Sequence, residues 1–287
     1  MTPAREPRTA NPCLDAAVFS CLLAVIASFA YGAADFCGGL AAKRTALYAV
    51  VIFSQLAGLF LVVLALPFLP PSSPTALDFA WGAGAGVAGG VGVAWLYRAL
   101  AKGVMSVIAP VTAVCAVIVP LLVGVALGER PSLRAMIGVL LAVVAIVLVS
   151  QSGVKAAATA VPLAIASGIA IGLFLVCLAR SGPPAGLWPL IAARVVAVSL
   201  FSTIRFEKPS RASLPLVIGG GALDMLANVL YVLAVRRGML SIVATLTSLY
   251  PTSTIVLARV VLGERLRIVQ RWGVVCAVAA ILLIVEG

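Results

Sequence analysis

The sequence contains no histidine, and only 10% of its 287 residues are charged. A chain without histidine has no imidazole general base, no histidine proton relay and no histidine metal ligand. Soluble globular domains carry about 25% charged residues, so this composition is unlike that of a soluble enzyme. The nine carboxylates lie mostly between the apolar runs. We therefore expect no metal site, no cofactor and no enzymatic activity.

Cysteines and basic residues are present, but without the patterns that would give them a special role. No CxxC pair occurs, and all six cysteines except Cys13 lie in or beside apolar runs, as small hydrophobic residues do. The net charge is +11, yet lysines and arginines stand singly or in pairs between apolar runs. Charges flanking membrane spans explain this better than nucleic-acid binding does. No nucleic-acid partner is expected.

Long apolar runs make up most of the chain. Hydrophobic residues account for 63% of it, against about 45–50% in soluble domains, so a lipid bilayer must surround most of these side chains. Within lipid every backbone polar group needs an internal partner, and long runs without alternation favour helices over a barrel. The sequence predicts an all-α membrane protein with ten transmembrane helices, near residues 17–37, 47–67, 77–99, 104–127, 133–150, 157–179, 185–204, 213–235, 239–262 and 267–285.

Residues 1–16 form a polar segment ahead of the first apolar run. A cleaved signal peptide would look similar, but its apolar region has only about 7–15 residues. The first run here is longer and many similar runs follow it. We therefore interpret it as the first membrane span.

The two halves of the chain repeat each other. The tetrapeptide LGER occurs at 127–130 and again at 262–265, and the alignment of these two motifs also places Gly138 opposite Gly273. Such self-similarity indicates a repeat architecture.

A similar relation joins the first span to the sixth, because LAVIASFAYG at 23–32 resembles LAIASGIAIG at 163–172. We expect one five-helix repeat at 17–150 and a second at 157–287. Five is an odd number, so the second repeat must be inverted in the membrane, as in many transporters.

Several stretches together resemble the EamA family of the drug/metabolite transporter superfamily. They are YGAADF at the end of the first span, ALAKGVMSVIAPV at 99–111, AVRRGMLSIVATL at 234–246, and the two LGER motifs. The resemblance implies ten spans, two inverted repeats, a central cavity and transport of small metabolites or drugs, often outward. It fixes no substrate. Where many relatives carry an arginine in the second span, this chain has Gln55, while Arg194 keeps the basic residue of the seventh span.

Charged residues inside predicted spans are the first candidates for function. Asp224 lies near the middle of the eighth span, where a carboxylate costs about 2.5–3.5 kcal/mol on insertion scales. Asn228 and Tyr231 share its helix face, and Arg194 lies at a similar depth in the seventh span. Asp224 either faces a cavity, where it takes a substrate amine or a proton, or forms a structural ion pair with Arg194.

Further candidates are less specific. Asp35 and Tyr31 lie toward the end of the first span, where Asp35 either lines the same cavity or is an interfacial carboxylate. Trp95 either anchors the helix at the membrane surface or faces the cavity. Tyr250 and Thr247 lie in the ninth span beside Pro251, where a broken helix would suit a binding site.

Structural roles are expected for other conspicuous residues. Gly82, Gly86 and Gly90 recur every four residues and predict close helix packing. Glu129 and Glu264 of the LGER motifs are expected to bond the N-terminus of the helix that follows each of them, or else to act as gates. Pro110 and Pro120 in the fourth span predict a bend there.

These observations favour a secondary transporter of a bacterial cytoplasmic membrane, exporting small molecules by alternating access. No GxxxxGK[ST] motif occurs, so the energy would come from a gradient, with protons as one coupling ion, or from downhill flow. A membrane enzyme acting on lipid-linked substrates and a channel are the alternatives. The distribution of lysines and arginines between the loops favours an N-terminus outside the cell, whereas the family resemblance implies an N-terminus inside. The sequence identifies neither the solute nor the oligomeric state.

Overall fold

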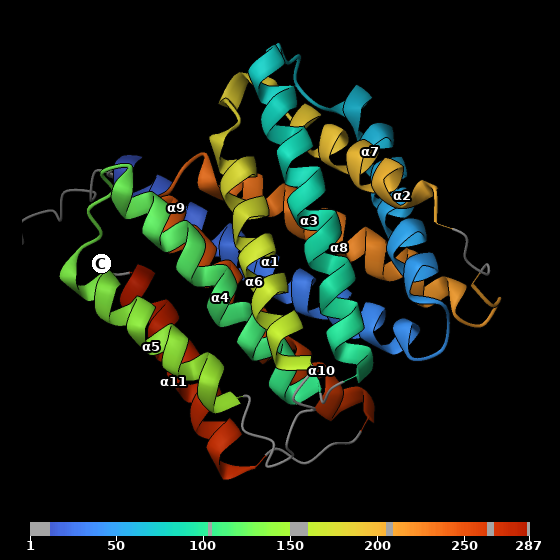
Figure 1. The fold of residues 1–287 in the computed structure, drawn as a ribbon. Helices are drawn as coiled ribbons and strands as arrows, with labels where there is room; N and C mark the ends of the chain where they lie inside the picture. The colour runs from blue at the N-terminus through green and yellow to red at the C-terminus, as the bar shows by residue number, and fades with distance from the viewer. Residues whose placement is uncertain (1–11, 103–104, 150–159, 205–208, 263–266, 286–287) are drawn as a thin grey trace, which may run out of the picture.

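The computed structural model describes residues 12–102, 105–149, 160–204, 209–262 and 267–285. In these residues the chain forms eleven α-helices and two short 3-10 helices, and no strand (Figure 1). The helices of the first half are α1 Pro12–Ala42, α2 Leu47–Ala65, α3 Ala76–Lys102, α4 Met105–Ala126 and α5 Leu133–Val149, with the 3-10 helix η1 at Leu66–Phe68. Those of the second half are α6 Ala160–Arg180, α7 Trp188–Ser202, α8 Leu214–Val235, α9 Leu240–Thr247, α10 Tyr250–Leu262 and α11 Ile268–Val285, with η2 at Pro183–Ala185.

The all-helical prediction is confirmed for the described residues. Five helices are long and apolar enough to cross a bilayer, namely α1, α2, α3, α6 and α8. The other predicted spans coincide with shorter apolar helices or, for the ninth, with α9 and α10 together. Ten membrane crossings therefore stay a prediction.

Large apolar side chains cover much of the outer surface. Phe60, Leu140 and Trp272 are each more than 60% exposed, and many leucines, valines and isoleucines lie exposed beside them. A protein in water seldom exposes so many large apolar side chains together, because each would gain free energy by burial. The surface suits contact with lipid.

Helices of one half pack mainly against helices of the other. Extensive contacts join α1 to α8, α3 to α6, α5 to α11, α4 to α6, α3 to α7, α2 to α8 and α2 to α7, and α1 and α4 also pack against α9 (Figure 1). When each helix is replaced by its counterpart in the other half, α1–α8 becomes α6–α3 and α3–α7 becomes α8–α2. The set of contacts therefore maps onto itself, as it does in an assembly with two-fold symmetry.

Glycines allow the closest of these helix contacts. A Cβ added at Gly86 in α3 would lie 2.5 Å from the carbonyl oxygen of Ala193 in α7. Gly221 in α8 is its counterpart when the LGER motifs are aligned, and a Cβ there would lie 2.2 Å from the carbonyl oxygen of Ser54 in α2. The packing role predicted for the four-residue glycine pattern of α3 is confirmed.

The first LGER motif forms the corner between α4 and α5. Gly128 has a φ of +91°, a conformation that glycine adopts without strain. The amide of Glu129 donates to the carbonyl of Gly124 and that of Gly128 to the carbonyl of Val125, at 3.0 Å each. This is the Schellman arrangement, which satisfies carbonyls left free at a helix end.

The sequence predicted that Glu129 bonds the N-terminus of the helix that follows it. In the described residues it does not. Its carboxylate instead accepts the backbone amides of Leu240, at 2.5 Å, and Ser241, at 2.9 Å, at the start of α9. Glu129 thus stabilises a helix N-terminus of the other half, 111 residues away. The expectation was wrong because the corner turns the side chain toward α9; Glu264 lies outside the described residues.

The ninth predicted span is interrupted at Ser248 and Leu249, between α9 and α10. Pro251 lies in the first turn of α10, where its missing amide costs no helical hydrogen bond. The predicted break is therefore found there. Its counterpart α4 contains Pro110 and Pro120 yet remains a single helix, so the two halves differ at this point.

Candidate functional site

A small cavity lies where helices of both halves meet, near the middle of their lengths. Its volume is about 70 Å³, enough for several water molecules but below the roughly 300–1,000 Å³ of pockets that hold drug-sized ligands. The lining residues come from nine of the helices and, through Ser248, from the α9–α10 break. They include Tyr31, Asp35, Gln55, Arg194, Asp224, Asn228, Thr247, Ser248 and Tyr250, together with Gly89, Val93, Leu96, Ala116, Ile171, Phe174 and Leu175.

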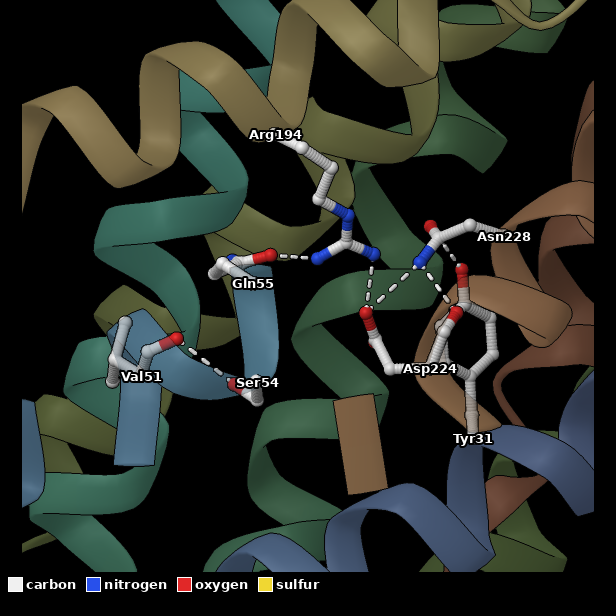
Figure 2. A network of polar contacts seen from close by, with 7 residues as sticks. All are labelled: Tyr31, Val51, Ser54, Gln55, Arg194, Asp224 and Asn228. Carbon is white, nitrogen blue, oxygen red and sulfur yellow. Dashed lines mark hydrogen bonds and ion pairs between the residues drawn. The ribbon is translucent and has the colours of Figure 1, made fainter. Parts of the chain in front are cut away.

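An ion pair forms the centre of the polar lining. The guanidinium of Arg194 in α7 donates through Nη2 to the carboxylate of Asp224 in α8 and through Nη1 to Oε1 of Gln55 in α2 (Figure 2). The Arg194 side chain is only 8% exposed and that of Asp224 is 28% exposed. The predicted pairing of these two residues is present, and it lies on the cavity wall, so the two alternatives drawn from the sequence are not exclusive.

Hydrogen bonds extend this pair to the first helix. Asn228 lies one turn beyond Asp224 and donates from Nδ2 to the Asp224 carbonyl at 2.7 Å and to its carboxylate at 3.2 Å. The hydroxyl of Tyr31 in α1 donates to Oδ1 of Asn228 at 2.7 Å (Figure 2). Four helices, two from each half, are thus joined through side chains within an apolar bundle. Networks of this kind hold their members in fixed positions when each donor and acceptor is matched.

Asp35 faces the same cavity without such a partner. It lies one helical turn from Tyr31 and is partly buried. No hydrogen bond or ion pair to its carboxylate occurs within the described residues. An unpaired carboxylate in an apolar environment is costly and normally recruits a cation or a proton. Of the two carboxylates on the cavity wall, Asp224 has a cation in contact with it, and Asp35 has none in the part of the chain that the structure describes.

The break between α9 and α10 contributes the remaining predicted polar residues. Thr247 and Tyr250 flank it, and both are more than 90% buried and line the cavity with Ser248. The Thr247 hydroxyl has no hydrogen-bond partner among the described residues. A buried hydroxyl without a partner is rare, so it is available to a bound solute.

Two residues singled out from the sequence lie elsewhere. Trp95 does not line the cavity and is 38% exposed on the outer surface. Successive residues of a helix are about 100° apart, so Trp95 points away from its neighbours Val93 and Leu96, which do line the cavity. Tyr231 is completely buried, and its hydroxyl donates to the carbonyl of Leu175 at 2.9 Å, which packs α8 against α6.

Sequence reasoning did not include Gln55 or Ser248 among the site residues. The sequence does point to Gln55, since an amide in an apolar run needs a hydrogen-bond partner, although Gln55 is conspicuous mainly as a replacement for arginine. It does not point to Ser248, because serine is tolerated in many membrane helices. The apolar lining residues are also indistinguishable, in sequence, from residues that face lipid.

A larger cavity of about 550 Å³ lies at the ends of α2, α7 and α8, between η1 and η2. Apolar residues and prolines make up most of its lining, and Arg236 is the one charged side chain among the described residues that line it. The Arg236 guanidinium donates to the carbonyl of Gly186 at 2.6 Å and so holds the η2 loop. None of the residues predicted for the site lines this cavity.

Comparisons with known proteins agree with this architecture. The model of the EamA-like transporter family matches residues 18–151 and again 156–286. A solved structure described only as the crystal structure of a protein superposes with a TM-score of 0.68 and 15% sequence identity. The superposition covers 92% of this chain and 95% of that chain, which supports the fold alone. No curated protein matches the sequence. Because the family model covers nearly the whole chain in two successive segments, this protein is a multi-pass membrane protein that belongs to the EamA-like transporter family.

Proposed function

We propose that this protein is a secondary transporter that carries a small solute through the central cavity by alternating access. The single observation that carries this proposal is the polar network of Tyr31, Gln55, Arg194, Asp224 and Asn228, which lines a cavity shared by both halves. Buried charges and amides in membrane helices are costly, and in membrane proteins they mark substrate or ion pathways.

The proposed architecture has ten spans in two inverted five-helix repeats, residues 17–150 and 157–287. Support comes from the contacts between helices, which map onto themselves when the halves are exchanged, and from the family model, which matches twice. Inverted halves of similar structure can exchange conformations, and this exchange would open the cavity first to one side of the membrane and then to the other.

We further propose that the protein resides in a bacterial cytoplasmic membrane and works mainly as an exporter. Since the sequence carries no GxxxxGK[ST] motif, the proposed energy source is a gradient or downhill flow. With Asp224 paired, Asp35 is the carboxylate most able to exchange a proton for solute. A channel or a membrane enzyme is the rival function, and neither needs a polar cavity shared by two related halves.

Transport is tested with the purified full-length protein in proteoliposomes. Vesicles preloaded with a mixed metabolite pool are placed in a trace of each labelled metabolite in turn, and counterflow is measured. We expect transient, saturable accumulation of at least one solute class. Flux proportional to concentration without saturation would indicate a channel, and chemical conversion of a lipid substrate would indicate an enzyme.

The inverted arrangement is tested by cysteine accessibility. In a background without the six native cysteines, Arg130→Cys and Arg265→Cys place one label site in each LGER corner. Inversion requires the two corners to react with a membrane-impermeant maleimide from opposite sides. Labelling of both from the same side would contradict the inverted repeats, whatever the transport assay shows.

A further inference from the structure

The internal repeat relates one wall of the central cavity to the other. When the two LGER motifs are aligned, Asp224 of α8 corresponds to Gly89 of α3, and Asn228 corresponds to Val93. All four residues line the cavity. Positions that carry a carboxylate and an amide in the second half therefore carry no polar side chain in the first.

The first and sixth helices show the same relation with the halves reversed. In the alignment of LAVIASFAYG with LAIASGIAIG, continued by one helical turn, Tyr31 corresponds to Ile171 and Asp35 to Leu175. All four line the cavity. The polar members lie on α1 and α8, which pack together, and the apolar members lie on α3 and α6, which also pack together. One wall of the cavity is thus polar and the opposite wall is apolar, although the two are built from equivalent backbone positions.

The polar wall also carries an unbalanced charge. The guanidinium of Arg194 is matched by the carboxylate of Asp224 and by Gln55, so this cluster is neutral as a unit. Asp35 adds one further carboxylate without a partner among the described residues. Within the described ranges no lysine, and no arginine other than Arg194, lines the cavity. A bound solute with a single positive charge would balance the wall.

We propose that the transported solute is an amphipathic monocation, an amine whose ammonium group binds Asp35 and whose apolar part packs against α3 and α6. This inference rests on the proposed transport function. Phe174 adds an aromatic ring to the apolar wall, and the Thr247 hydroxyl, which has no partner in the described part of the chain, is available to a polar substituent. A polar and an apolar wall on opposite sides fix the orientation of such a solute, since either group would lose its partner if the solute were reversed.

The test measures binding of four matched probes to the full-length protein in nanodiscs by titration calorimetry. Phenethylamine has the ammonium group and the apolar part, phenethyl alcohol lacks the charge, phenylacetate reverses it, and methylamine lacks the apolar part. We expect the wild type to bind phenethylamine at least 10-fold more tightly than any of the others. Equal binding of the alcohol or the acid, or absence of binding by the whole series, would overturn the proposal.

Three variants locate the binding groups. Asp35→Asn should weaken phenethylamine binding at least 10-fold, while Asp35→Glu should keep the preference for the amine over the alcohol. Leu175→Ser should weaken phenethylamine several-fold without removing that preference. Because Asp35 has no partner among the described residues, Asp35→Asn should not lower the unfolding temperature, which excludes misfolding as the cause. Unchanged binding in Asp35→Asn would also overturn the proposal.

The outcome can be separated from that of the transport proposal. If counterflow finds a neutral or anionic solute and no amine, the protein is a transporter and the amine inference is wrong. If no solute class shows saturable counterflow although phenethylamine binds at Asp35, the transport proposal fails and the cation site remains.

Discussion

The two walls of the cavity have the same backbone plan and opposite chemistry. The α1–α8 wall carries a tyrosine, two carboxylates and an amide, and at the equivalent positions the α3–α6 wall carries glycine, valine, isoleucine and leucine. Packing is retained in both halves, as Gly86 against α7 and Gly221 against α2 show. The comparison teaches that two repeats can keep the helix contacts that hold the fold while their cavity side chains diverge. The result is a site with a polar side and an apolar side.

Removal of the arginine should disturb the polar wall most. Arg194→Gln leaves the Asp224 carboxylate without its cation, and breaking a buried pair in this way costs about 3–5 kcal/mol. We expect a large fall in the unfolding temperature, measured by thermal unfolding in nanodiscs, with loss of transport.

The double variant Arg194→Gln/Asp224→Asn sharpens this prediction. It removes both charges, so it should be clearly more stable than Arg194→Gln alone, and the difference gives the coupling between the two side chains. If the single and double variants were equally unstable, the ion pair would contribute little and the arginine would act only through packing.

Glycine substitutions test whether the close helix contacts beside the two walls contribute equally to stability. Gly221→Ala would place a Cβ 2.2 Å from the Ser54 carbonyl oxygen, and Gly86→Ala would place one 2.5 Å from that of Ala193. Overpacking of this kind costs about 1–3 kcal/mol. We expect both variants to lower the unfolding temperature by similar amounts.

A matched control lies two residues from Gly221. A Cβ at Gly219 would meet no atom within 4 Å, so Gly219→Ala should leave stability unchanged or raise it slightly through helix propensity. A large effect at only one of Gly86 and Gly221 would break the equivalence of the two halves.

Much of this architecture could be predicted from the sequence, because lipid imposes a strong pattern on it. Charged residues in apolar runs are costly, and that cost alone was enough to single out Arg194 and Asp224 as candidates for a shared cavity or an ion pair. The partner of Glu129 could not be predicted, since it lies 111 residues away and depends on how α9 packs against α4.

The residues that line the apolar wall could not be predicted from the sequence either. Val93 and Ile171 lie in apolar runs, where residues facing a cavity and residues facing lipid have the same composition. The sequence left Trp95 open between a membrane-surface anchor and a cavity residue for a related reason, because its helix has glycines and apolar residues on every side, and so no polar stripe shows which face is inward.

A smaller effect is expected where the network reaches the first helix. Tyr31→Phe removes the hydroxyl that donates to Asn228 and leaves the ring in place. A typical net hydrogen bond contributes about 0.5–1.5 kcal/mol, so the unfolding temperature should fall modestly. Because the hydroxyl also positions the Asn228 amide next to Asp224, the transport rate should fall by more than the small loss of stability would explain. A loss of stability as large as that of Arg194→Gln would contradict this ranking.

The smallest stability effect at a cavity residue is expected at the helix break, and its sign is opposite to that expected for Arg194→Gln and Tyr31→Phe. Thr247→Val replaces a buried hydroxyl that has no partner among the described residues with a methyl group of similar size. Removing an unsatisfied polar group is nearly neutral or stabilising, so the unfolding temperature should stay constant or rise. If the hydroxyl instead serves the bound solute, the same variant should bind or transport that solute several-fold more weakly. Ser253→Ala is the matched control, since that hydroxyl is already bonded to the carbonyls of Ser28 and Tyr250, and its loss should lower stability by up to about 1 kcal/mol with solute affinity unchanged. A Thr247→Val protein that is less stable and equally active would show that the hydroxyl has a structural partner and no role toward the solute.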